Sequence, residues 1–202
     1  MTAVLVLATT SAGKLREFRS LMAGLPLDLR ALSEFPGEPP AVAEDGLTYA
    51  ANATKKAVAI AAWTRRAAMA DDSGLEVDAL GGAPGVHSAR YAGERQDGGA
   101  NIAKLLAALR GVPDEDRTAR FRCVIVVARP DGATLTAEGT CEGRILDISR
   151  GGGGFGYDPV FLYPPLGRTF AEIPAGIKDQ LSHRAHACAA LRPQLMAFLS
   201  KR

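Results

Sequence analysis

The chain has 202 residues, of which 24 are Lys or Arg and 22 are Asp or Glu, so its formal net charge is only +2. This length is enough for one domain with a normal hydrophobic core, and neither a metal nor a disulfide is needed to fold it. A charge so close to zero argues against the phosphate backbone of a nucleic acid as a partner. We therefore expect a single domain over residues 1–202 that does not bind nucleic acid.

The cysteines and the first residues indicate the compartment. Cys123, Cys141 and Cys188 are odd in number, widely spaced and without a metal-ligand pattern, which argues against disulfides and against a zinc site. Residues 1–10 are apolar but lack a basic region and are too short to span a bilayer. We expect a reducing, cytoplasmic setting and no membrane partner.

Strand patterns and helix patterns alternate along the first half of the chain. The apolar residues from Leu15 to Leu25 recur at the spacing of one helical face, and the segment before Trp63 is rich in Ala and free of Gly and Pro. Strands are expected at residues 4–8, 27–32 and 67–70, helices at residues 15–25 and 47–63, and a Pro- and Gly-rich loop at residues 34–46. This alternation predicts an α/β fold.

The second half continues in the same way. Pro193 is expected to kink a last helix that starts near Ser182. Before it we expect a glycine-rich loop at residues 81–93, a helix at 102–109, a hairpin of strands 121–128 and 134–140, further strands at 144–148 and 160–163, and a loop at 150–159.

Asp71 and Asp72 stand where the third strand is expected to end, directly before Ser73 and Gly74. Ligands of open α/β sheets bind at strand ends, so two acids at this position suggest a metal ion or an activated water. Asp, Ser and Gly are equally typical of caps and turns. From this segment alone both interpretations stay open.

Residues 9–14, with the sequence TTSAGK, lie at the junction of the first strand and the first helix. Free backbone N–H groups and the helix dipole favour an anion there. Lys14 in the first turn is disfavoured by roughly 0.3 to 1 kcal/mol, a penalty that a bound phosphate would reverse. The alternative is an ordinary cap, with Ser11 capping and Lys14 in water. The spacing of a Walker A loop is absent.

Glu44 adds a third carboxylate to the pair at residues 71–72. Mg²⁺ is usually held by one or two carboxylates together with substrate phosphates and water, so the number of acids is suitable. Lys56 lies one helix away and is placed to offset this charge or to contact a phosphate, although a solvated helical lysine is the simpler interpretation of that residue alone.

The glycine-rich residues 151–156 permit a close backbone approach, and Phe155 is suited to lie against a flat base. Asp158 is able to accept hydrogen bonds from a base or a sugar. The alternative is a wide turn in which Phe155 and Tyr157 simply pack. Lys178 and the segment at residues 182–184 place more basic side chains near the start of the last helix.

Taken together, these segments resemble the Ham1 family of inosine and xanthosine triphosphate pyrophosphatases. The resemblance runs from residue 9 to residue 184 and is carried by TTSAGK, Glu44, ADDSGL at 70–75, SARY at 88–91, GFGYDP at 154–159, Lys178 and SHR at 182–184. It implies an elongated mixed-sheet α/β fold of two lobes around a central substrate cleft, usually in a homodimer. It also implies a house-cleaning enzyme that uses Mg²⁺ to hydrolyse ITP, dITP and XTP to the monophosphate and pyrophosphate, and so keeps them out of DNA and RNA.

The resemblance also assigns roles to residues. Glu44 and Asp72 would hold Mg²⁺, and Asp72 would also be the catalytic proton acceptor for the attacking water. Substrate would be bound by Thr9, Thr10, Ser11, Ala12, Gly13, Lys14, Lys56, Ser73, Phe155, Gly156, Tyr157, Asp158, Lys178, His183 and Arg184. Ser11 departs from the pattern, because members of the family commonly have Asn there. Serine keeps a hydroxyl but loses reach and the amide donor.

Selectivity requires a feature that separates inosine and xanthosine from adenosine. Both carry a 6-oxo acceptor where adenosine has an amino donor, so a donor from His183 or Arg184 would favour them. Rejection of GTP must depend on its 2-amino group. Two rival functions are a pyrophosphatase of the related Maf-like type and a noncatalytic nucleotide sensor. The sequence leaves the choice between Asp71 and Asp72 as the base open.

Overall fold

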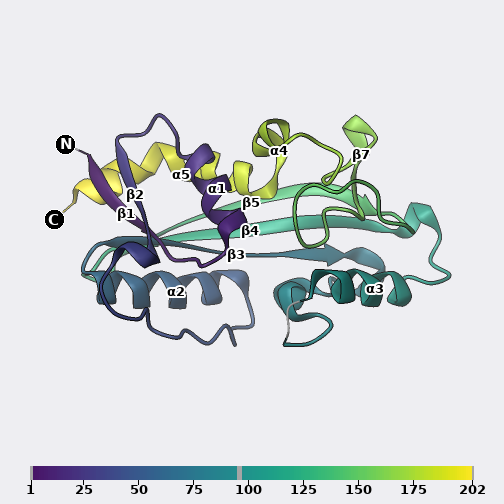
Figure 1. Cartoon of the computed structure of the whole chain (residues 1–202), viewed down its shortest axis with the longest axis horizontal. Helices are drawn as coiled ribbons and strands as arrows, with labels where there is room; N and C mark the ends of the chain where they lie inside the picture. Colours follow the sequence, from purple (N-terminus) through teal and green to yellow (C-terminus); the bar gives the residue numbers. More distant parts are fainter. Residues whose placement is uncertain (1, 95–96, 202) are drawn as a thin grey trace. The chain divides into compact units, whose positions relative to one another are not determined.

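The structure is a computed structural model that describes residues 2–94 and 97–201. Within these residues, one seven-stranded sheet has the order β2-β1-β3-β4-β5-β6-β7 (Figure 1). β1 pairs in parallel with β2 and β3, whereas β6 pairs antiparallel with β5 and β7, so the sheet is mixed. The strands are β1 (Ala3–Leu7), β2 (Leu27–Ala31), β3 (Ala67–Val77), β4 (Thr118–Ala128), β5 (Thr134–Ile145), β6 (Phe161–Tyr163) and β7 (Arg168–Thr169).

Helices connect these strands, which confirms the expected α/β class with a mixed sheet. The α-helices are α1 (Ala12–Leu21), α2 (Tyr49–Thr64), α3 (Gly98–Ala108), α4 (Ala175–Leu181) and α5 (His183–Ser200). Short 3-10 turns occur at η1 (Leu32–Glu34), η2 (Asp78–Leu80), η3 (Gly85–Arg90), η4 (Asp114–Asp116) and η5 (Pro164–Leu166).

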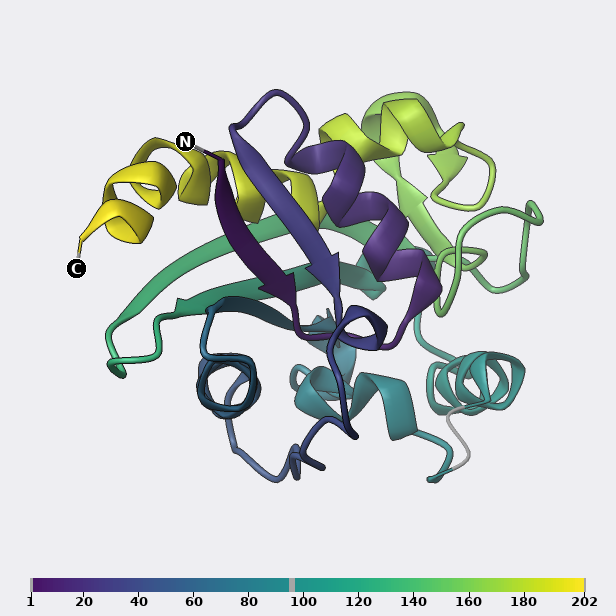
Figure 2. The same cartoon turned by 60° about the vertical axis from the view of Figure 1, so that its left-hand side comes forward.

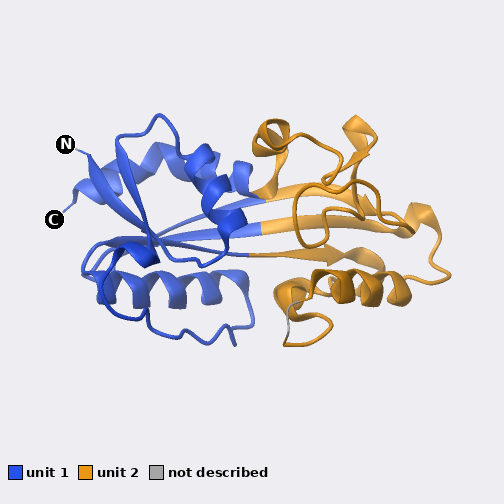
Figure 3. Cartoon of the chain, in the orientation of Figure 1, with its two compact units in different colours: residues 1–72, 123–139, 184–202 blue, residues 73–122, 140–183 orange. Residues whose placement is uncertain are grey.

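The chain divides into two compact units, which Figure 3 shows in different colours. Unit 1 comprises Met1–Asp72, Cys123–Gly139 and Arg184–Arg202, and unit 2 comprises Ser73–Arg122 and Thr140–His183. β3, β4 and β5 each contribute residues to both units. The single domain, the elongated shape and the central cleft stay predictions.

Unit 1 is a sheet with helices on both faces. α1 and α5 cover one face and α2 covers the other, as Figures 1 and 2 show. Leu5 and Leu7 of β1 belong to the core that α1 and α5 complete. Val6, between them, is also buried, as expected for a strand that is covered on both sides. The parallel register sets Leu5 opposite Leu29 of β2.

Unit 2 has its own hydrophobic core, in which aromatic rings are prominent. The ring centroids of Phe121 and Phe161 lie 4.5 Å apart, and those of Phe161 and Phe170 lie 4.9 Å apart. Leu105 and Leu109 at the C-terminal end of α3 pack into the same core. These aromatic contacts fix the position of the glycine-rich segment, because Tyr157 is part of the core as well.

β3 differs from the expectation at the point that matters most for function. We expected the strand to end at residue 70 and the acids to follow it or to form a turn, but β3 continues through Asp71 and Asp72 to Val77. Both expectations are therefore wrong. Burial on both sides explains the difference, because most residues of β3 are buried and the packing of a strand overrides the turn preference of Asp, Ser and Gly.

The other differences are smaller. The separate strand expected at residues 144–148 is absent from the structure, since β5 simply extends to Ile145. α4 and the two-residue strand β7 were not expected from the sequence. α5 begins at His183, close to the expected start, and its residues Leu191 and Leu195 are buried. Among the residues that the structure describes, no helix combines the length and the apolar composition needed to cross a membrane.

Replacing Leu191 with Ala tests the core of unit 1. Leu191 is fully buried, so the change removes contacts and leaves a cavity, and we expect the free energy of unfolding to fall by about 2 to 5 kcal/mol. Leu47→Ala is the control, because Leu47 is 93% exposed and the loss there should stay within about 0.5 kcal/mol. Urea denaturation measures both. Equal losses would show that the assigned core is wrong.

Candidate active site

The two neighbouring acids of β3 have different surroundings. Successive side chains of a strand point to opposite faces of the sheet. Accordingly, Asp71 contacts Lys14 of α1 and Arg184 of α5, whereas Asp72 contacts Asn52 of α2. Both acids are buried, with exposed fractions of 3% and 6%. Because the pleat directs the two side chains to opposite faces of the sheet, each carboxylate has its own set of partners.

Asp71 lies between two cations. The Nζ atom of Lys14 is 2.9 Å from each of its carboxylate oxygens, and the Nε atom of Arg184 is 3.4 Å from Oδ2. Burial alone would raise the pKa of Asp71, but the positive charges of Lys14, Arg184 and Lys56 outweigh it and hold that pKa well below its usual range. Asp71 is therefore an ionised carboxylate that forms ion pairs with Lys14 and Arg184, and it is a weak base.

Arg184 continues this ion-pair network. Its Nη1 atom is 3.0 Å from Oε2 of Glu17 on α1. Burial by itself would lower the pKa of Arg184, but the charges of Asp71 and Glu17 raise it above its usual value. Arg184 was expected beside a nucleoside, and Glu17 was not expected at the site. The available signal was spacing, because Glu17 lies three residues after Lys14 and so shares a face of α1 with it.

Residues 9–11 lead into α1, which begins at Ala12. Ser11 is the N-cap, and its Oγ atom accepts a hydrogen bond of 3.4 Å from the Lys14 backbone N–H. Thr9 Oγ1 accepts a hydrogen bond of 3.1 Å from the Ser11 N–H. The ordinary cap is thus present, but Lys14 does not point into water, because its amine contacts Asp71. Thr10, Ser11 and Ala12 are exposed.

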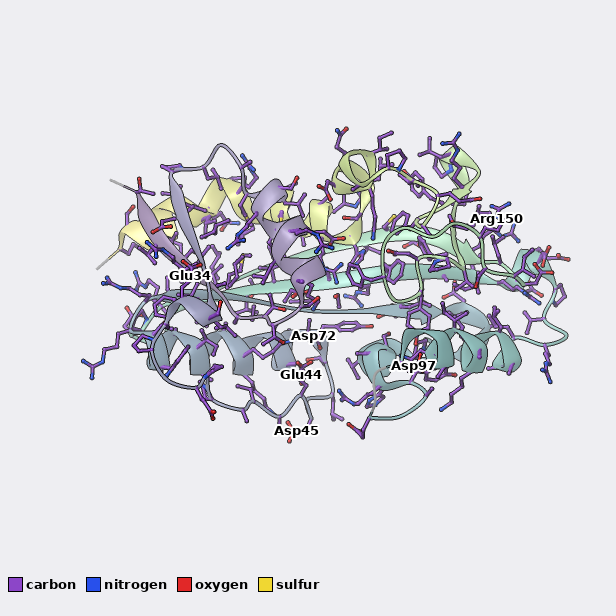
Figure 4. The ribbon with its side chains drawn as sticks, viewed as in Figure 1. Glu34, Glu44, Asp45, Asp72, Asp97 and Arg150 are labelled. Atoms are coloured by element: carbon purple, nitrogen blue, oxygen red, sulfur yellow. The ribbon has the colours of Figure 1, made fainter. Side chains whose placement is uncertain are left out.

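Asp72 faces a loop that carries the third acid. Its Oδ2 atom accepts a hydrogen bond of 2.9 Å from the side-chain amide of Asn52, whose own oxygen accepts one of 2.8 Å from the Gly46 N–H. Two residues earlier, Glu44 lies 3.2 Å from the Nζ atom of Lys56. In Figure 4, Glu44 lies on the side of its loop nearer Asp72, whereas Asp45 lies at the outer edge.

Glu44 and Asp72 are acids that could hold a cation together, because the charge of Glu44 acts on Asp72. Burial raises the pKa of Asp72, and the charge of Glu44 raises it further, against the opposing effects of Lys56 and Asn52. In residues 2–94 and 97–201 no group of three or more His, Cys, Asp or Glu side chains is arranged to hold a metal. Two carboxylates nevertheless suit Mg²⁺, which takes its other ligands from phosphates and water.

In unit 2, Asp158 and Lys178 form a buried ion pair. The Nζ atom of Lys178 is 2.6 Å from Oδ2 of Asp158, which also accepts a hydrogen bond of 2.8 Å from the Phe155 N–H. A Cβ atom on Gly154 would lie 2.0 Å from that same oxygen, so only glycine allows this approach. Phe155 remains 40% exposed, and its ring centroid is 5.0 Å from the Lys178 amine.

The remaining site residues of unit 2 are more deeply packed. The hydroxyl of Tyr157 donates a hydrogen bond of 2.8 Å to the Ser88 carbonyl, and burial raises its pKa. The ring of His183 stacks on Phe121 with a centroid distance of 4.8 Å. Ser73 is partly buried in β3. Tyr157 is thus a packed residue, as the alternative interpretation of the glycine-rich segment expected. Phe155 is not fully packed, because its ring is partly exposed.

The structure therefore gathers the expected residues in two groups. Unit 1 contains an acidic pair beside lysines and a helix N-terminus, which is the composition of a phosphate- and cation-binding site. Unit 2 contains an exposed aromatic ring above a buried Asp–Lys pair. In unit 1 the expected residues are Thr9 to Lys14, Glu44, Lys56, Asp72 and Arg184, and in unit 2 they are Ser73, Phe155 to Asp158, Lys178 and His183.

Such a fold and such residues define an α/β protein of the nucleotide-processing kind, and comparison with known proteins gives the family. The model of the Ham1 family matches residues 5–194, so the chain belongs to the Ham1 family.

Named relatives and solved structures agree with this membership. The chain is 53% identical over 190 residues to a dITP/XTP pyrophosphatase of Geobacillus kaustophilus, covering 94% of this chain and 93% of the relative. It is 53% identical over 196 residues to the dITP/XTP pyrophosphatase of Xanthomonas oryzae pv. oryzae, covering 96% and 98%. The Ham1 protein structures of Staphylococcus aureus and Coxiella burnetii are each 40% identical, with TM-scores of 0.85 and 0.87, and each comparison covers 96% of this chain and 99% of the other.

Replacing Asp71 with Asn tests the buried ion pairs. The change leaves Lys14 and Arg184 without their shared counter-charge, so we expect a loss of about 3 kcal/mol in unfolding free energy at pH 7. Because the pKa of Asp71 is lowered on folding, its ionised form stabilises the protein above the unfolded pKa of about 3.9 and loses that effect as the pH falls toward the native value. The difference between wild type and variant should therefore narrow below about pH 4. Urea denaturation from pH 7 to pH 3 measures it, and a constant difference would contradict the assignment.

Proposed function

We propose that this chain is a nucleoside triphosphate pyrophosphohydrolase that hydrolyses the deaminated purine nucleotides ITP, dITP and XTP to the monophosphate and pyrophosphate. One observation carries the proposal in structural terms. Asp71 lies between the cations of Lys14 and Arg184, whereas its neighbour Asp72 is joined through Asn52 to the loop that carries Glu44. Membership of the Ham1 family supports it, as do relatives named dITP/XTP pyrophosphatase at about half identity over nearly the whole chain.

The residues of unit 1 suit the triphosphate and the reacting water. The N-terminus of α1 offers backbone N–H groups to phosphate oxygens, and Lys14 adds a positive charge beside them. Asp72 is a better proton acceptor than Asp71, since the pKa of Asp72 is raised and that of Asp71 is lowered. We assign Asp72 as the base that takes a proton from the water attacking the α-phosphorus, while Lys14 and Lys56 contact the phosphates.

Glu44 and Asp72 would hold the divalent cation, which we propose to be Mg²⁺. The fit rests on the donor set, because carboxylate oxygens are ligands that Mg²⁺ takes in proteins, and the side chain of Asn52 joins Asp72 to the loop that carries Glu44. When bound, the ion supplies positive charge to the phosphate oxygens and to the leaving pyrophosphate. Lys56 then supports the site by balancing Glu44.

The residues of unit 2 suit the nucleoside. Phe155 presents a flat exposed ring for stacking, and the Asp158–Lys178 pair provides a carboxylate and an amine of fixed position. We retain the proposal that a donor from His183 or Arg184 selects the 6-oxo group. For Arg184 this donation must accommodate the ion pairs to Asp71 and Glu17. Ser73 and Tyr157 complete the set of proposed substrate contacts.

The proposed setting follows the family and the cysteines. We propose a homodimer in the cytoplasm, with a purine nucleoside triphosphate as partner and with neither nucleic acid nor a membrane as one. Cys123, Cys141 and Cys188 are free and buried, which supports a reducing compartment.

Substitution of the two acids tests the proposed activity. With Glu44→Gln or Asp72→Asn, we expect pyrophosphate release from ITP in the presence of Mg²⁺ to fall about 100-fold or more, because each change removes a ligand charge and the second also removes the base. Asp45→Asn is a matched control, since Asp45 is adjacent to Glu44 but exposed and paired with Lys55.

The same assay with ITP, dITP, XTP, GTP and ATP separates the candidate functions. A pyrophosphohydrolase of deaminated purines should strongly prefer the first three substrates. Wild-type turnover in both acid variants would contradict the assigned site. Equal turnover of ATP and ITP would contradict the selectivity, and binding of ITP without pyrophosphate release would indicate a sensor.

Replacing Phe155 with Ala tests the nucleoside contact. Base stacking on an aromatic side chain contributes about 1 to 3 kcal/mol, so we expect KM for ITP to rise about 10-fold with a smaller change in kcat. Leu166→Ala is the control, because Leu166 is another exposed apolar side chain of unit 2. Steady-state kinetics measure both variants. An unchanged KM in Phe155→Ala would exclude stacking on this ring.

A further inference from the structure

Asn52 is a buried polar residue in the first turn of α2, and only 1% of it is exposed. Its side-chain oxygen accepts the Gly46 N–H at 2.8 Å, and its side-chain nitrogen donates to Oδ2 of Asp72 at 2.9 Å. One carboxamide therefore joins β3 to the loop that carries Glu44. The sequence analysis did not single out this residue.

The direction of the amide follows from its partners. A backbone N–H only donates, so the side-chain oxygen of Asn52 must face Gly46. The nitrogen must then face Asp72, where a carboxylate oxygen accepts its proton. Aspartate, leucine or alanine at position 52 cannot make both bonds. The carboxamide of asparagine can accept from the N–H of the loop and donate to the carboxylate of β3 at the same time.

Gly46 allows the loop to approach the amide. A Cβ atom at this position would lie 2.6 Å from the Asn52 side-chain oxygen and 3.0 Å from the Ala51 Cβ. Both contacts are closer than ordinary packing. A Cβ atom at position 46 would therefore displace the Asn52 side-chain oxygen from the Gly46 N–H, and glycine keeps this hydrogen bond in place.

Lys56 lies one turn further along α2 and contacts the same loop. Residues four apart share a helix face, and the Lys56 amine is 3.2 Å from Glu44. Lys56 holds the Glu44 side chain, while Asn52 holds the backbone two residues later and the partner acid on β3. One face of α2 thus contacts both carboxylates.

The geometry points to Asn52 as a positioning residue that sets the separation of Glu44 and Asp72 for a divalent cation, an inference that rests on the proposed metal role of those two acids. Partners behind metal ligands orient them, and their loss typically lowers metal affinity about 10- to 100-fold. Asn52 acts in this way on Asp72 directly, and on Glu44 through the backbone of Gly46.

Asn101 provides a matched control within the same chain. It is also a buried asparagine in the first turn of a helix, α3, and it also fastens a loop, accepting from the Ala92 N–H at 2.6 Å and donating to the Ala89 carbonyl at 2.9 Å. Both partners of Asn101 are backbone groups, whereas one partner of Asn52 is a carboxylate. Loss of Asn101 should therefore lower stability without affecting metal binding.

The experiment compares Asn52→Ala, Gly46→Ala and their double variant with Asn101→Ala. Two quantities are measured in full-length protein. One is the Mg²⁺ concentration that gives half-maximal pyrophosphate release from ITP. The other is Mn²⁺ binding to the protein, followed by loss of the free-ion EPR signal with an ITP analogue that has a methylene bridge between the α- and β-phosphorus atoms, after the loss caused by the analogue alone is subtracted.

In both single variants we expect the metal concentration for half-maximal activity and binding to rise about 10-fold or more. The value of kcat at saturating Mg²⁺ should fall by a smaller factor. The double variant should match the weaker single variant, because both changes remove the same connection. Asn101→Ala should keep the wild-type metal affinity. Gly46→Ala keeps the test decisive if Asn52→Ala does not fold.

The outcomes separate this inference from the proposed function. If Glu44→Gln lowers metal affinity but Asn52→Ala and Gly46→Ala do not, the positioning role is wrong while the metal site stands. An equal loss of metal affinity in Asn101→Ala would also overturn the inference, because it would trace the effect to general destabilisation. If Glu44→Gln and Asp72→Asn both bind Mn²⁺ as the wild type does, the proposed metal site itself fails.

Discussion

In β3, the pleat of the strand turns the side chains of Asp71 and Asp72 to opposite faces of the sheet. Two acids that are adjacent in a strand point to opposite faces, so a sheet covered on both sides must bury both of them in different surroundings. On one face, Lys14 and Arg184 supply fixed positive charge to Asp71. On the other, Asp72 meets the amide of Asn52. Identical side chains therefore acquire opposite shifts in pKa.

The two surroundings have different energetic consequences. A buried carboxylate without a counter-charge is costly, and the cations around Asp71 remove that cost within the folded chain itself. Asp72 instead accepts a hydrogen bond from Asn52, and Glu44 contacts Lys56. Asp71 thus serves stability, whereas Asp72 is the acid to which the proposed function assigns binding and proton transfer.

Local patterns predicted much of the fold of unit 1. The strand at the start, the helix after TTSAGK and the Ala-rich helix α2 all follow from periodicity and propensity, and the structure confirms them. The continuation of β3 through Asp71 and Asp72 could not be predicted in the same way. It depends on burial from both sides, whereas the residues 71–74 themselves favour a turn.

The residues of the candidate site that lie in motifs could be predicted from the sequence. Single helical residues that contact the site from a distant part of the chain could not. Glu17 and Asn52 occupy ordinary helical positions, and the spacing of Glu17 from Lys14 is the one local signal for either of them. Their importance arises from contacts with Arg184 and Asp72, which are distant along the chain. Long-range pairing of this kind is invisible to periodicity, because periodicity describes only which face of a helix is buried.

The serine at position 11 shows how a local rule can preserve a site while one residue changes. Members of the family commonly have Asn there, and both Asn and Ser are favourable N-caps. In this chain the Ser11 hydroxyl accepts a hydrogen bond from the Lys14 backbone N–H at the start of α1. The amine of Lys14 then reaches Asp71. Serine at position 11 therefore keeps the N-cap of the helix, while it lacks the amide donor of asparagine.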